Sequence, residues 1–405
     1  MPRNQVLIGE AREVMRSRIP DETIDLVVTS PPYYGLRDYG DDCATVWGGD
    51  PDCEHDWIET VRLNSLGGPP GSTADVRNTQ LGIQRFEIKE GTCRTCGAWR
   101  GQLGHEADPD TYVEHLMTII REIYRVLKPT GSFWLNLGDT YYGGQDDEDD
   151  PEWLQDQQLL GVPERVLVAM QKEGWILRNK IIWTKPNAMP SSTKTRFTPK
   201  HEVVYFFVKQ VGYFFDYDAV SIPRQLKLGE KIEGDLRGKN PGDVWSIPTE
   251  ACPDAHFAVF PPALVEPIIK ACCPREVCLI CGKPRERIWE SRKPEGGYDG
   301  VRNVGGRTDG YMTRLGKNIR AIWIFKGWSK CSCGAGFIPG MVLDPFAGSG
   351  TALRVARHLN RSFIGIEIVP KYAEMSQRRV KTDVYKQLPN GVVPLSEYVE
   401  EEKIG

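Results

Sequence analysis

Short apolar runs alternate with amphipathic stretches along this chain. Residues 6–9, 24–28, 132–137, 179–183, 202–208, 341–343 and 362–367 form short, mostly apolar runs, as expected of buried strands. Before the run at 132–137, apolar side chains recur at steps of three and four residues, which predicts an amphipathic helix. We expect this helix to begin at an Asp110 N-cap and to end in the segment 128–131. Its apolar positions are Tyr112, Val113, Leu116, Ile119, Ile120, Ile123 and Leu127.

Further helices are predicted to end near Met15 and His358, and to cover residues 163–172. Strands that alternate with helices in this way favour an α/β fold with a doubly wound, mostly parallel sheet. Residues 40–105, 224–243 and 284–320 lack such periodicity and are rich in glycine, proline or charged residues. We interpret these segments as insertions into the α/β fold.

Size and charge limit the class of protein. A chain of 405 residues can form one large α/β domain with a second region. Its net charge is −4, so a surface for nucleic acid must be local. Neither a signal peptide nor an apolar run of about 18 residues is found, so we expect a cytosolic protein without a membrane partner. The 11 cysteines of a cytosolic chain are expected to bind metal rather than to form disulfides.

A proline pair ends the predicted strand at 24–28. The segment reads Ser30-Pro31-Pro32-Tyr33, and consecutive prolines cannot continue a hydrogen-bonded ladder. The turn therefore presents a hydroxyl, backbone carbonyls and an aromatic ring at the carboxyl end of a strand, where open α/β sheets bind ligands. Such a set suits a flat ring with an amino group, for example a nucleobase. These four residues alone are equally compatible with a simple strand exit.

A glycine-rich turn follows the predicted strand at 341–343. It lacks the ending of a phosphate-binding loop and the full G-x-G-x-x-G pattern. Glu367 ends the next strand, where nucleotide-binding folds place a carboxylate on ribose hydroxyls. A ligand with an adenosine ribose and no phosphate fits this pattern, and S-adenosylmethionine is one, with Asp344 facing its ammonium group; another ligand of a nucleotide fold stays open. The turn consists of Asp344, Pro345, Phe346, Ala347, Gly348, Ser349, Gly350 and Thr351.

Two groups of cysteines have the close spacing of structural zinc sites. The first group is Cys53, His55, Cys93 and Cys96, and the second is Cys278, Cys281, Cys331 and Cys333. We expect one or two structural Zn²⁺ ions, which would fold insertions too small to bury a core. Ordinary buried thiols are the alternative for both groups. The remaining cysteines at 43, 252, 272 and 273 are interpreted as core or incidental residues.

Together, the two turns resemble the motifs of the N4-cytosine/N6-adenine DNA amino-methyltransferases. That family carries D/S-P-P-Y for catalysis and D-P-F-x-G-S-G-T for the cofactor, and here the catalytic motif comes first, as in the permuted β class. The resemblance extends to residues 126–131, 183–187 and 256–269. It implies a circularly permuted, Rossmann-like class I methyltransferase fold with zinc-knuckle insertions and S-adenosylmethionine as cofactor. In the last segment, Phe257 and residues 261–264 are expected at the methionine end of the cofactor.

The resemblance also implies a chemistry. Ser30 Oγ and the Pro31 carbonyl would accept hydrogen bonds from the amino group of a flipped-out base, and Tyr33 would stack on that base. Serine at the first motif position favours N4 of cytosine, with N6 of adenine as the second choice. RNA or a protein glutamine as substrate, or an inactive methylase fold that binds DNA through zinc, are remoter alternatives. The implied partners are double-stranded DNA, a second copy of the chain and a cognate restriction endonuclease, in a prokaryotic or phage-infected cytoplasm.

The same resemblance divides the chain. Residues 1–40 and 106–223 form the catalytic half, 41–105 an insertion with one zinc knuckle, 224–335 a target-recognition region with the other, 336–385 the cofactor half and 386–405 a tail. Within the target-recognition region, residues 244–272 return to the core. Basic residues interleaved with aromatics at 282–330 and the basic stretch at 185–200 are expected to contact DNA. Tyr34, Arg37 and Tyr39 either touch DNA or pack the loop.

Overall fold

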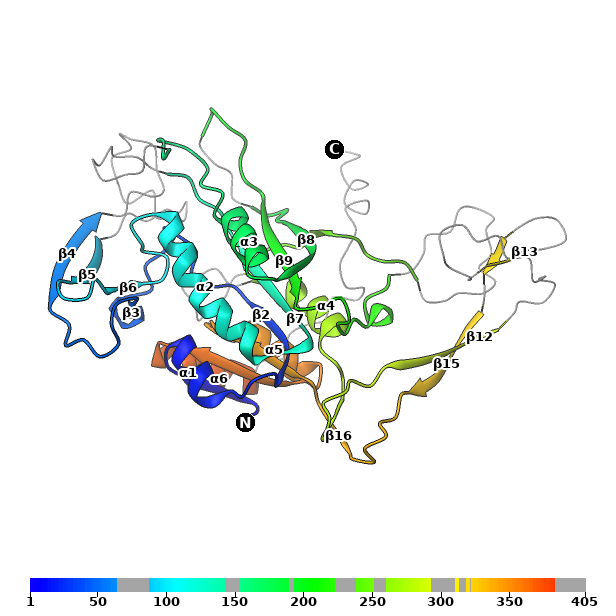
Figure 1. Cartoon of the computed structure of the whole chain (residues 1–405). Helices are drawn as coiled ribbons and strands as arrows, with labels where there is room; N and C mark the ends of the chain where they lie inside the picture. Colours follow the sequence, from blue (N-terminus) through cyan, green and yellow to red (C-terminus); the bar gives the residue numbers. More distant parts are fainter. Residues whose placement is uncertain are drawn as a thin grey trace.

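An eight-stranded sheet with helices on both faces forms the body of the protein (Figure 1). The computed structural model describes residues 1–63, 87–142, 153–188, 193–222, 238–250, 260–292, 310–312, 318–320 and 322–382. From one edge to the other the strands are β1 (Gln5–Ile8), β18 (Ser362–Glu367), β17 (Met341–Asp344), β2 (Ile24–Thr29), β7 (Leu127–Leu137), β9 (His201–Val208), β8 (Ile176–Thr184) and β10 (Val244–Ser246).

The predicted mostly parallel sheet is confirmed. Strands β1, β18, β17, β2 and β7 run parallel to one another. Strand β9 is antiparallel to both β7 and β8, because β8 and β9 are joined as a hairpin by the segment 185–200. Its direction places the first residues of β9 at the same edge of the sheet as the last residues of β2 and β7.

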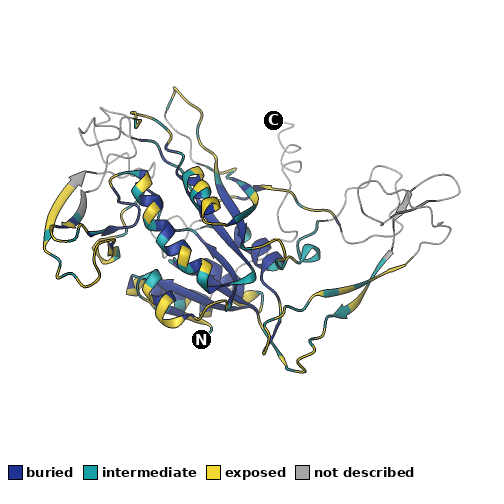
Figure 2. Cartoon of the chain, viewed as in Figure 1, coloured by how far each residue is buried: buried dark blue, intermediate teal, exposed yellow. Residues whose placement is uncertain are grey.

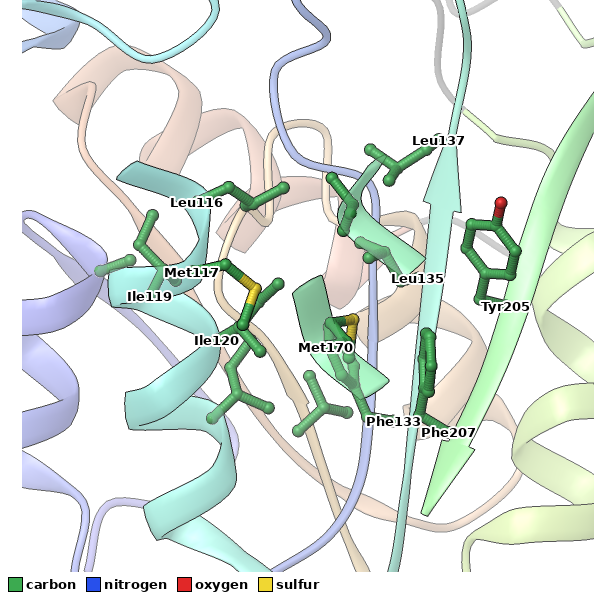
Figure 3. Packing of buried hydrophobic residues seen from close by; sticks show 14 of the residues in the cluster. Leu116, Met117, Ile119, Ile120, Phe133, Leu135, Leu137, Met170, Tyr205 and Phe207 are labelled. Atoms are coloured by element: carbon green, nitrogen blue, oxygen red, sulfur yellow. The ribbon is translucent and has the colours of Figure 1, made fainter. Parts of the chain in front are cut away.

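In the part of the chain that the structure describes, three helices cover each face of the sheet, so the doubly wound arrangement is also confirmed. Helices α1 (Ala11–Arg18), α2 (Pro109–Val126) and α3 (Val162–Lys172) bury one core. Helices α4 (Pro262–Cys272), α5 (Thr351–His358) and α6 (Pro370–Thr382) bury the other. Figure 3 shows Leu116 and Ile120 of α2 and Met170 of α3 facing Phe133 of β7 and Phe207 of β9. The buried residues are concentrated in this sheet and on the inner faces of its helices (Figure 2).

Two predicted boundaries of the long helix are wrong. The N-cap is Asp108, whose side chain accepts hydrogen bonds from the backbone N–H groups of Asp110 and Thr111, both at 2.9 Å. Pro109 takes the first helical position, where a missing N–H does no harm. At the other end, α2 gives way directly to β7, which begins at Leu127 and includes the predicted stop segment. A register shift opposite Ile24 and Leu26 accommodates the proline there.

The first insertion is a small four-stranded antiparallel sheet rather than an irregular segment. Its order is β3 (Ala44–Trp47), β6 (Trp99–Gln102), β5 (Glu87–Cys93) and β4 (Trp57–Leu63). Val46, Ile58 and Val61 are exposed on it, so its strands lack the clean apolar alternation that would have identified them from the sequence.

The strands at the two ends of the predicted insertion at 284–320 form an arm that extends away from the body (Figure 1). Strands β12 (Arg287–Arg292) and β15 (Ile322–Trp328) pair antiparallel along it. Arg287 at its base forms an ion pair with Asp216 of the body at 2.9 Å. Further short strands are β11 (Val277–Cys278), β16 (Phe337–Ile338), β13 (Gly310–Met312) and β14 (Asn318–Arg320). Among the described helices, none combines the length and the apolar character needed to cross a membrane.

Candidate active site

Both sequence motifs line one cavity of about 820 Å³. Ser30, Pro31, Pro32 and Tyr33 follow the carboxyl end of β2, and Glu367 is the last residue of β18. The cavity wall also contains Asp344, Pro345, Phe346, Ala347, Gly348, Ser349 and Thr351 from the turn after β17. Residues that lie more than 300 positions apart in the chain therefore share one site, because β2 and β17 are adjacent parallel strands.

The Tyr33 hydroxyl lies at the centre of a hydrogen-bond network on the catalytic side. It donates to Glu202 Oε2 at 2.9 Å and accepts from Ser30 Oγ at 3.0 Å. Asn136 Nδ2 donates to the Tyr33 oxygen at 2.7 Å and to Glu202 Oε2 at 3.0 Å. The Glu202 carboxylate also forms an ion pair with Lys185. Burial, reinforced by the Glu202 charge, raises the pKa of Tyr33 well above its ordinary value, so the phenol keeps its proton.

Two glycines hold Tyr33 in place. A β-carbon on Gly138 would lie 2.7 Å from the Tyr33 ring, and one on Gly104 would lie 2.7 Å from the Tyr33 carbonyl oxygen. Both contacts are closer than a real β-carbon allows, so only glycine fits at either position. The backbone of Pro32 is held as well, since its carbonyl accepts a hydrogen bond from Tyr112 at 2.8 Å. The ring is therefore preorganised before any ligand binds.

Two buried carboxyl groups face the other end of the cavity. Asp344 accepts hydrogen bonds from Thr29 Oγ1 at 2.6 Å and from the Phe346 backbone at 3.1 Å. Burial raises the pKa of Asp344 to about 7, against the lowering effect of these hydrogen bonds. Glu367 accepts from the backbone N–H of Gly348 at 2.8 Å, and burial raises its pKa too. Among the described residues, no lysine, arginine or histidine side chain forms an ion pair with Asp344. Its site therefore suits a cationic group of a ligand.

The two glycines of this turn have different tasks. Gly348 has φ of +48°, and a β-carbon there would meet only the Phe346 oxygen at 3.9 Å, so the turn leaves open space beside the cavity it lines. Gly350 has φ of +77°, and its β-carbon would lie 2.3 Å from Ser376 Oγ of α6. Gly350 is not part of the cavity wall; it allows the turn to pack against a helix.

The first insertion forms a third wall of the cavity. Cys43, Trp47 and Gln102 of the insertion line it, next to Tyr39. The insertion also holds the catalytic turn, because the Gly35 backbone N–H donates to the Gly104 oxygen at 2.7 Å. The site is therefore built from the central sheet and from the insertion together.

Comparison with known proteins identifies the family. A family model described as DNA methylase, covering N6 and N4 methyltransferases, matches residues 24–280 and 338–378, well over half of the chain. The chain belongs to this DNA methylase family.

Individual relatives agree with this membership. This methylase is 28% identical over 392 residues to the Type II methyltransferase M.SmaI of Serratia marcescens, covering 93% of this chain and 90% of the relative. It is also 28% identical over 389 residues to M.Cfr9I of Citrobacter freundii, covering 92% and 86%. Among solved structures, the PvuII DNA methyltransferase (cytosine-N4-specific) matches with a TM-score of 0.50 and 17% identity over 95% of this chain and 90% of that one. This last likeness shows a shared fold.

The methylase brings the first cysteine group together as predicted. Ligand atoms of Cys53, His55, Cys93 and Cys96 all lie within 4.8 Å of one another, and the two cysteine sulfurs at 53 and 93 are 3.9 Å apart. A tetrahedron with Zn–S bonds of about 2.3 Å has sulfurs about 3.8 Å apart, so this donor set fits Zn²⁺. Gly97, with φ of +72°, closes the turn by donating to the Cys93 oxygen at 3.0 Å.

The second cysteine group is also assembled. Cys278, Cys281, Cys331 and Cys333 meet the same 4.8 Å limit, at the base of the β12–β15 arm. Hydrogen bonds from the backbone N–H groups of Cys281 and Ile280 lower the pKa of the Cys278 thiol to about 6, which favours the thiolate that a metal needs. Of the other cysteines, Cys272 and Cys273 are buried in the core as predicted, Cys43 lines the cavity, and Cys252 lies outside the described residues.

Other predicted positions have mixed outcomes. Tyr34 is buried and donates to the Ala107 oxygen at 3.1 Å, so it packs the loop, whereas Arg37 and Tyr39 line the cavity. In the segment before the cofactor turn, Phe257 lies outside the described residues, Leu264 is buried in the core, and Phe260 lines the cavity instead. All of the basic residues between 293 and 317 also lie outside the described residues.

Two residues of the cavity network were missed from the sequence. Asn136 and Glu202 line the cavity, but each belongs to an apolar strand. Lys185 was expected to contact DNA, and it pairs with Glu202 in the cavity wall. The one available signal was a carboxylate at the start of a strongly apolar strand, where a charge is costly unless it has a partner.

Proposed function

We propose that this methylase transfers a methyl group from S-adenosylmethionine to the exocyclic amino group of a base flipped out of double-stranded DNA, with N4 of cytosine as the preferred acceptor. The single observation that carries the proposal is the shared cavity of the Ser30–Tyr33 turn and the Asp344–Thr351 turn. In fold terms we propose a circularly permuted class I methyltransferase, since the catalytic strand precedes the cofactor strands in the chain.

The residues at the Asp344 end fit the donor. S-adenosylmethionine supplies a methyl group bound to a positively charged sulfur, which is a good leaving group. Asp344 is placed to face the ammonium group and Glu367 the ribose hydroxyls, and the open space beside Gly348 lets the ligand approach the backbone. Phe346 and Phe260 supply apolar surface in the same wall.

The residues at the Ser30 end fit the acceptor. An exocyclic amino nitrogen is a weak nucleophile because its lone pair is delocalised into the ring. Acceptors aimed at its protons, here Ser30 Oγ and the Pro31 carbonyl, favour the nucleophilic form and stabilise the charge that develops during transfer. The Tyr33 ring, fixed against Gly138, adds a cation–π contribution to that charge.

The choice of base rests on Ser30, because serine at this motif position favours cytosine and aspartate favours adenine. N6 of adenine is the alternative. A DNA-binding protein with an inactive methylase fold would bind the cofactor without turnover; the intact network around Tyr33 argues against it.

We assign the loop between β8 and β9 to the DNA surface next to the pocket. Phe197 is 99% exposed there, and the neighbouring cations Lys194, Arg196 and Lys200 are exposed as well. Cations suit phosphates, and an apolar ring suits an opened base stack. The β12–β15 arm is the proposed site of target recognition. The second copy of the chain and the partner nuclease stay predictions.

Both cysteine groups are proposed to hold structural Zn²⁺. Each offers four donors, which leaves no open position for catalysis. The first ion would hold the insertion that forms a wall of the active site, and the second would hold the base of the arm.

The function is tested by incubating the protein with S-adenosylmethionine that carries a labelled methyl group and a panel of duplex DNAs, followed by mass spectrometry of the nucleosides. We expect label in N4-methylcytosine within one sequence context. Label in N6-methyladenine would move the choice to the alternative base, and no label in any DNA would overturn the proposal.

Cofactor affinity should increase as the pH rises through about 7. Below its folded pKa of about 7 the Asp344 carboxyl is neutral, and above it the carboxylate pairs with the ligand ammonium group. For one such group, affinity for S-adenosylhomocysteine should rise about tenfold from pH 6 to pH 8. Isothermal calorimetry with the wild-type protein and Asp344→Asn measures this, and the variant should bind weakly at both pH values.

The stability of the unliganded protein should show the opposite trend and decrease as the pH rises. Asp344 has its pKa raised from 3.8 by folding, so its contribution to stability is complete below pH 4 and is lost as the pH rises through about 7.

For the affinity measurement, 5′-methylthioadenosine, which lacks the amino-acid portion, is the control ligand. Equal pH dependence for both ligands would contradict the placement of Asp344 at the ammonium group.

A further inference from the structure

Glu202 stands at the end of a continuous line of hydrogen-bonding groups that begins at the catalytic serine. Ser30 Oγ is 3.0 Å from the Tyr33 hydroxyl, and that hydroxyl is 2.9 Å from Glu202 Oε2. Lys185 pairs with the other carboxylate oxygen of Glu202. Glu202 comes from the antiparallel strand β9, 169 positions after Tyr33, and lies outside both sequence motifs.

The direction of each hydrogen bond follows from the number of protons available. A carboxylate paired with an ammonium group has no proton, so Glu202 can only accept. Tyr33 has a single proton, which it therefore donates to Glu202. The Tyr33 oxygen is left as an acceptor, and Asn136 Nδ2, which only donates, approaches it at 2.7 Å. Ser30 must then donate its own proton to Tyr33. Asn136 Nδ2 donates to Ser30 Oγ at 3.5 Å, and this leaves one lone pair of Ser30 Oγ to accept from a ligand.

We propose that Glu202 is the general base of the methyl transfer and acts through Tyr33 and Ser30 as a proton relay. This inference rests on the proposed function. The amino nitrogen of the base forms its bond to the methyl carbon while the carbon–sulfur bond breaks, and the electron pair of that bond stays on sulfur. The nitrogen becomes cationic and loses one proton to Ser30 Oγ. The Ser30 proton passes to the Tyr33 oxygen, and the Tyr33 proton passes to Glu202 Oε2.

The surroundings allow the relay to reset. The product amine is neutral, Ser30 and Tyr33 each hold one proton as before, and Glu202 has become a neutral acid. The Glu202 side chain is 18% exposed and that of Lys185 is 20% exposed, so the proton can leave to water at the cavity rim. Neither Ser30 nor Tyr33 has to ionise at any stage, because each gains one proton as it gives one away. This agrees with the raised pKa of Tyr33, which makes a stable phenolate unfavourable.

The relay explains why the motif ends in tyrosine in this chain. Stacking on a base needs only an aromatic ring, which phenylalanine would supply equally well. The hydroxyl is needed for the contacts to Ser30 and Glu202. Removing the hydroxyl should therefore have the same effect on rate as removing the carboxylate.

The test is single-turnover methyl transfer at saturating cofactor and DNA, from pH 5.5 to pH 9. Glu202→Gln, which keeps the size but cannot take a proton, should be about 100-fold slower across this range. Tyr33→Phe should behave alike, and the double variant should be no slower than either single variant, because both interrupt one pathway.

The control is Glu164→Gln on α3. The Glu164 carboxylate forms an ion pair with Lys180 at 2.5 Å, and it is not part of the cavity wall. It should keep the wild-type rate and profile. Cofactor affinity and thermal unfolding report folding, and if Glu202→Gln does not fold, Tyr33→Phe alone decides. A wild-type rate and profile in Glu202→Gln, or additive losses in the double variant, would overturn the relay and leave the methyltransferase function intact. No transfer by the wild-type protein would overturn both.

Discussion

Replacing Ser30 with alanine should lower the rate constant of methyl transfer about 100-fold or more, while the affinity for the cofactor stays unchanged. In the proposed reaction the Ser30 hydroxyl accepts a hydrogen bond from the amino group of the base. Loss of one preorganised polar group at a reacting centre typically has an effect of this size. Replacing Tyr33 with alanine should have at least as large an effect, since it removes the stacking ring as well as the hydroxyl. Single-turnover transfer to duplex DNA measures both rates, and calorimetry with S-adenosylhomocysteine measures cofactor binding.

A matched control is Ser17→Ala, an exposed serine on α1 whose hydroxyl donates to the Glu13 backbone at 2.7 Å. It makes the same chemical change on the surface and should leave the rate unaltered. Because Ser30 lies on the acceptor side, its effect belongs in the rate constant rather than in the cofactor dissociation constant. A Ser30→Ala protein that transfers methyl groups at the wild-type rate would remove Ser30 from the reaction.

Loss of the first proposed metal site should be the other large effect. The double variant Cys93→Ser/Cys96→Ser removes two of four donors, and structural zinc contributes about 10 kcal/mol or more to the folding of small zinc-dependent units. The four-stranded insertion should then unfold locally and release both Tyr33 and the cavity wall. We expect one Zn²⁺ fewer per chain by elemental analysis, faster proteolysis within residues 41–105, and loss of most cofactor affinity and methyl transfer.

The second metal site supplies the comparison. Cys331→Ser/Cys333→Ser should also remove one ion, but its cluster lies at the base of the arm rather than at the cavity. DNA affinity should fall while cofactor affinity is retained. Wild-type protein without bound zinc after purification free of chelators would contradict both sites, and a zinc-free first cluster with full cofactor affinity would contradict the link between the insertion and the active site.

The elements with strong local patterns were predictable from the sequence. Strands β2 and β18 and helix α3 have the expected extents to within one residue, and helix α5 ends at His358 as predicted, because period and capping are local properties. The insertion sheet was not predictable, since its strands are half exposed and its stability depends on a cluster of cysteines brought together from distant positions. The N-cap at Asp108 was missed by two residues because Asp110 offers the same chemistry and Pro109 is compatible with either start.

The sequence by itself determined the two turns that line the cavity, the eight candidate metal ligands and the class of fold. Each of these depends on residues close together in the chain, whose backbone preferences and side-chain chemistry act locally. Only the tertiary structure decided that Glu202 and Asn136 contact Tyr33, that Gly104 and Gly138 hold its ring and backbone, and that Gly350 serves packing rather than the cavity. These contacts join residues from different strands and from the insertion. They depend on which strands become neighbours and in which direction β9 runs, and a hydrophobic pattern along one chain does not contain that information.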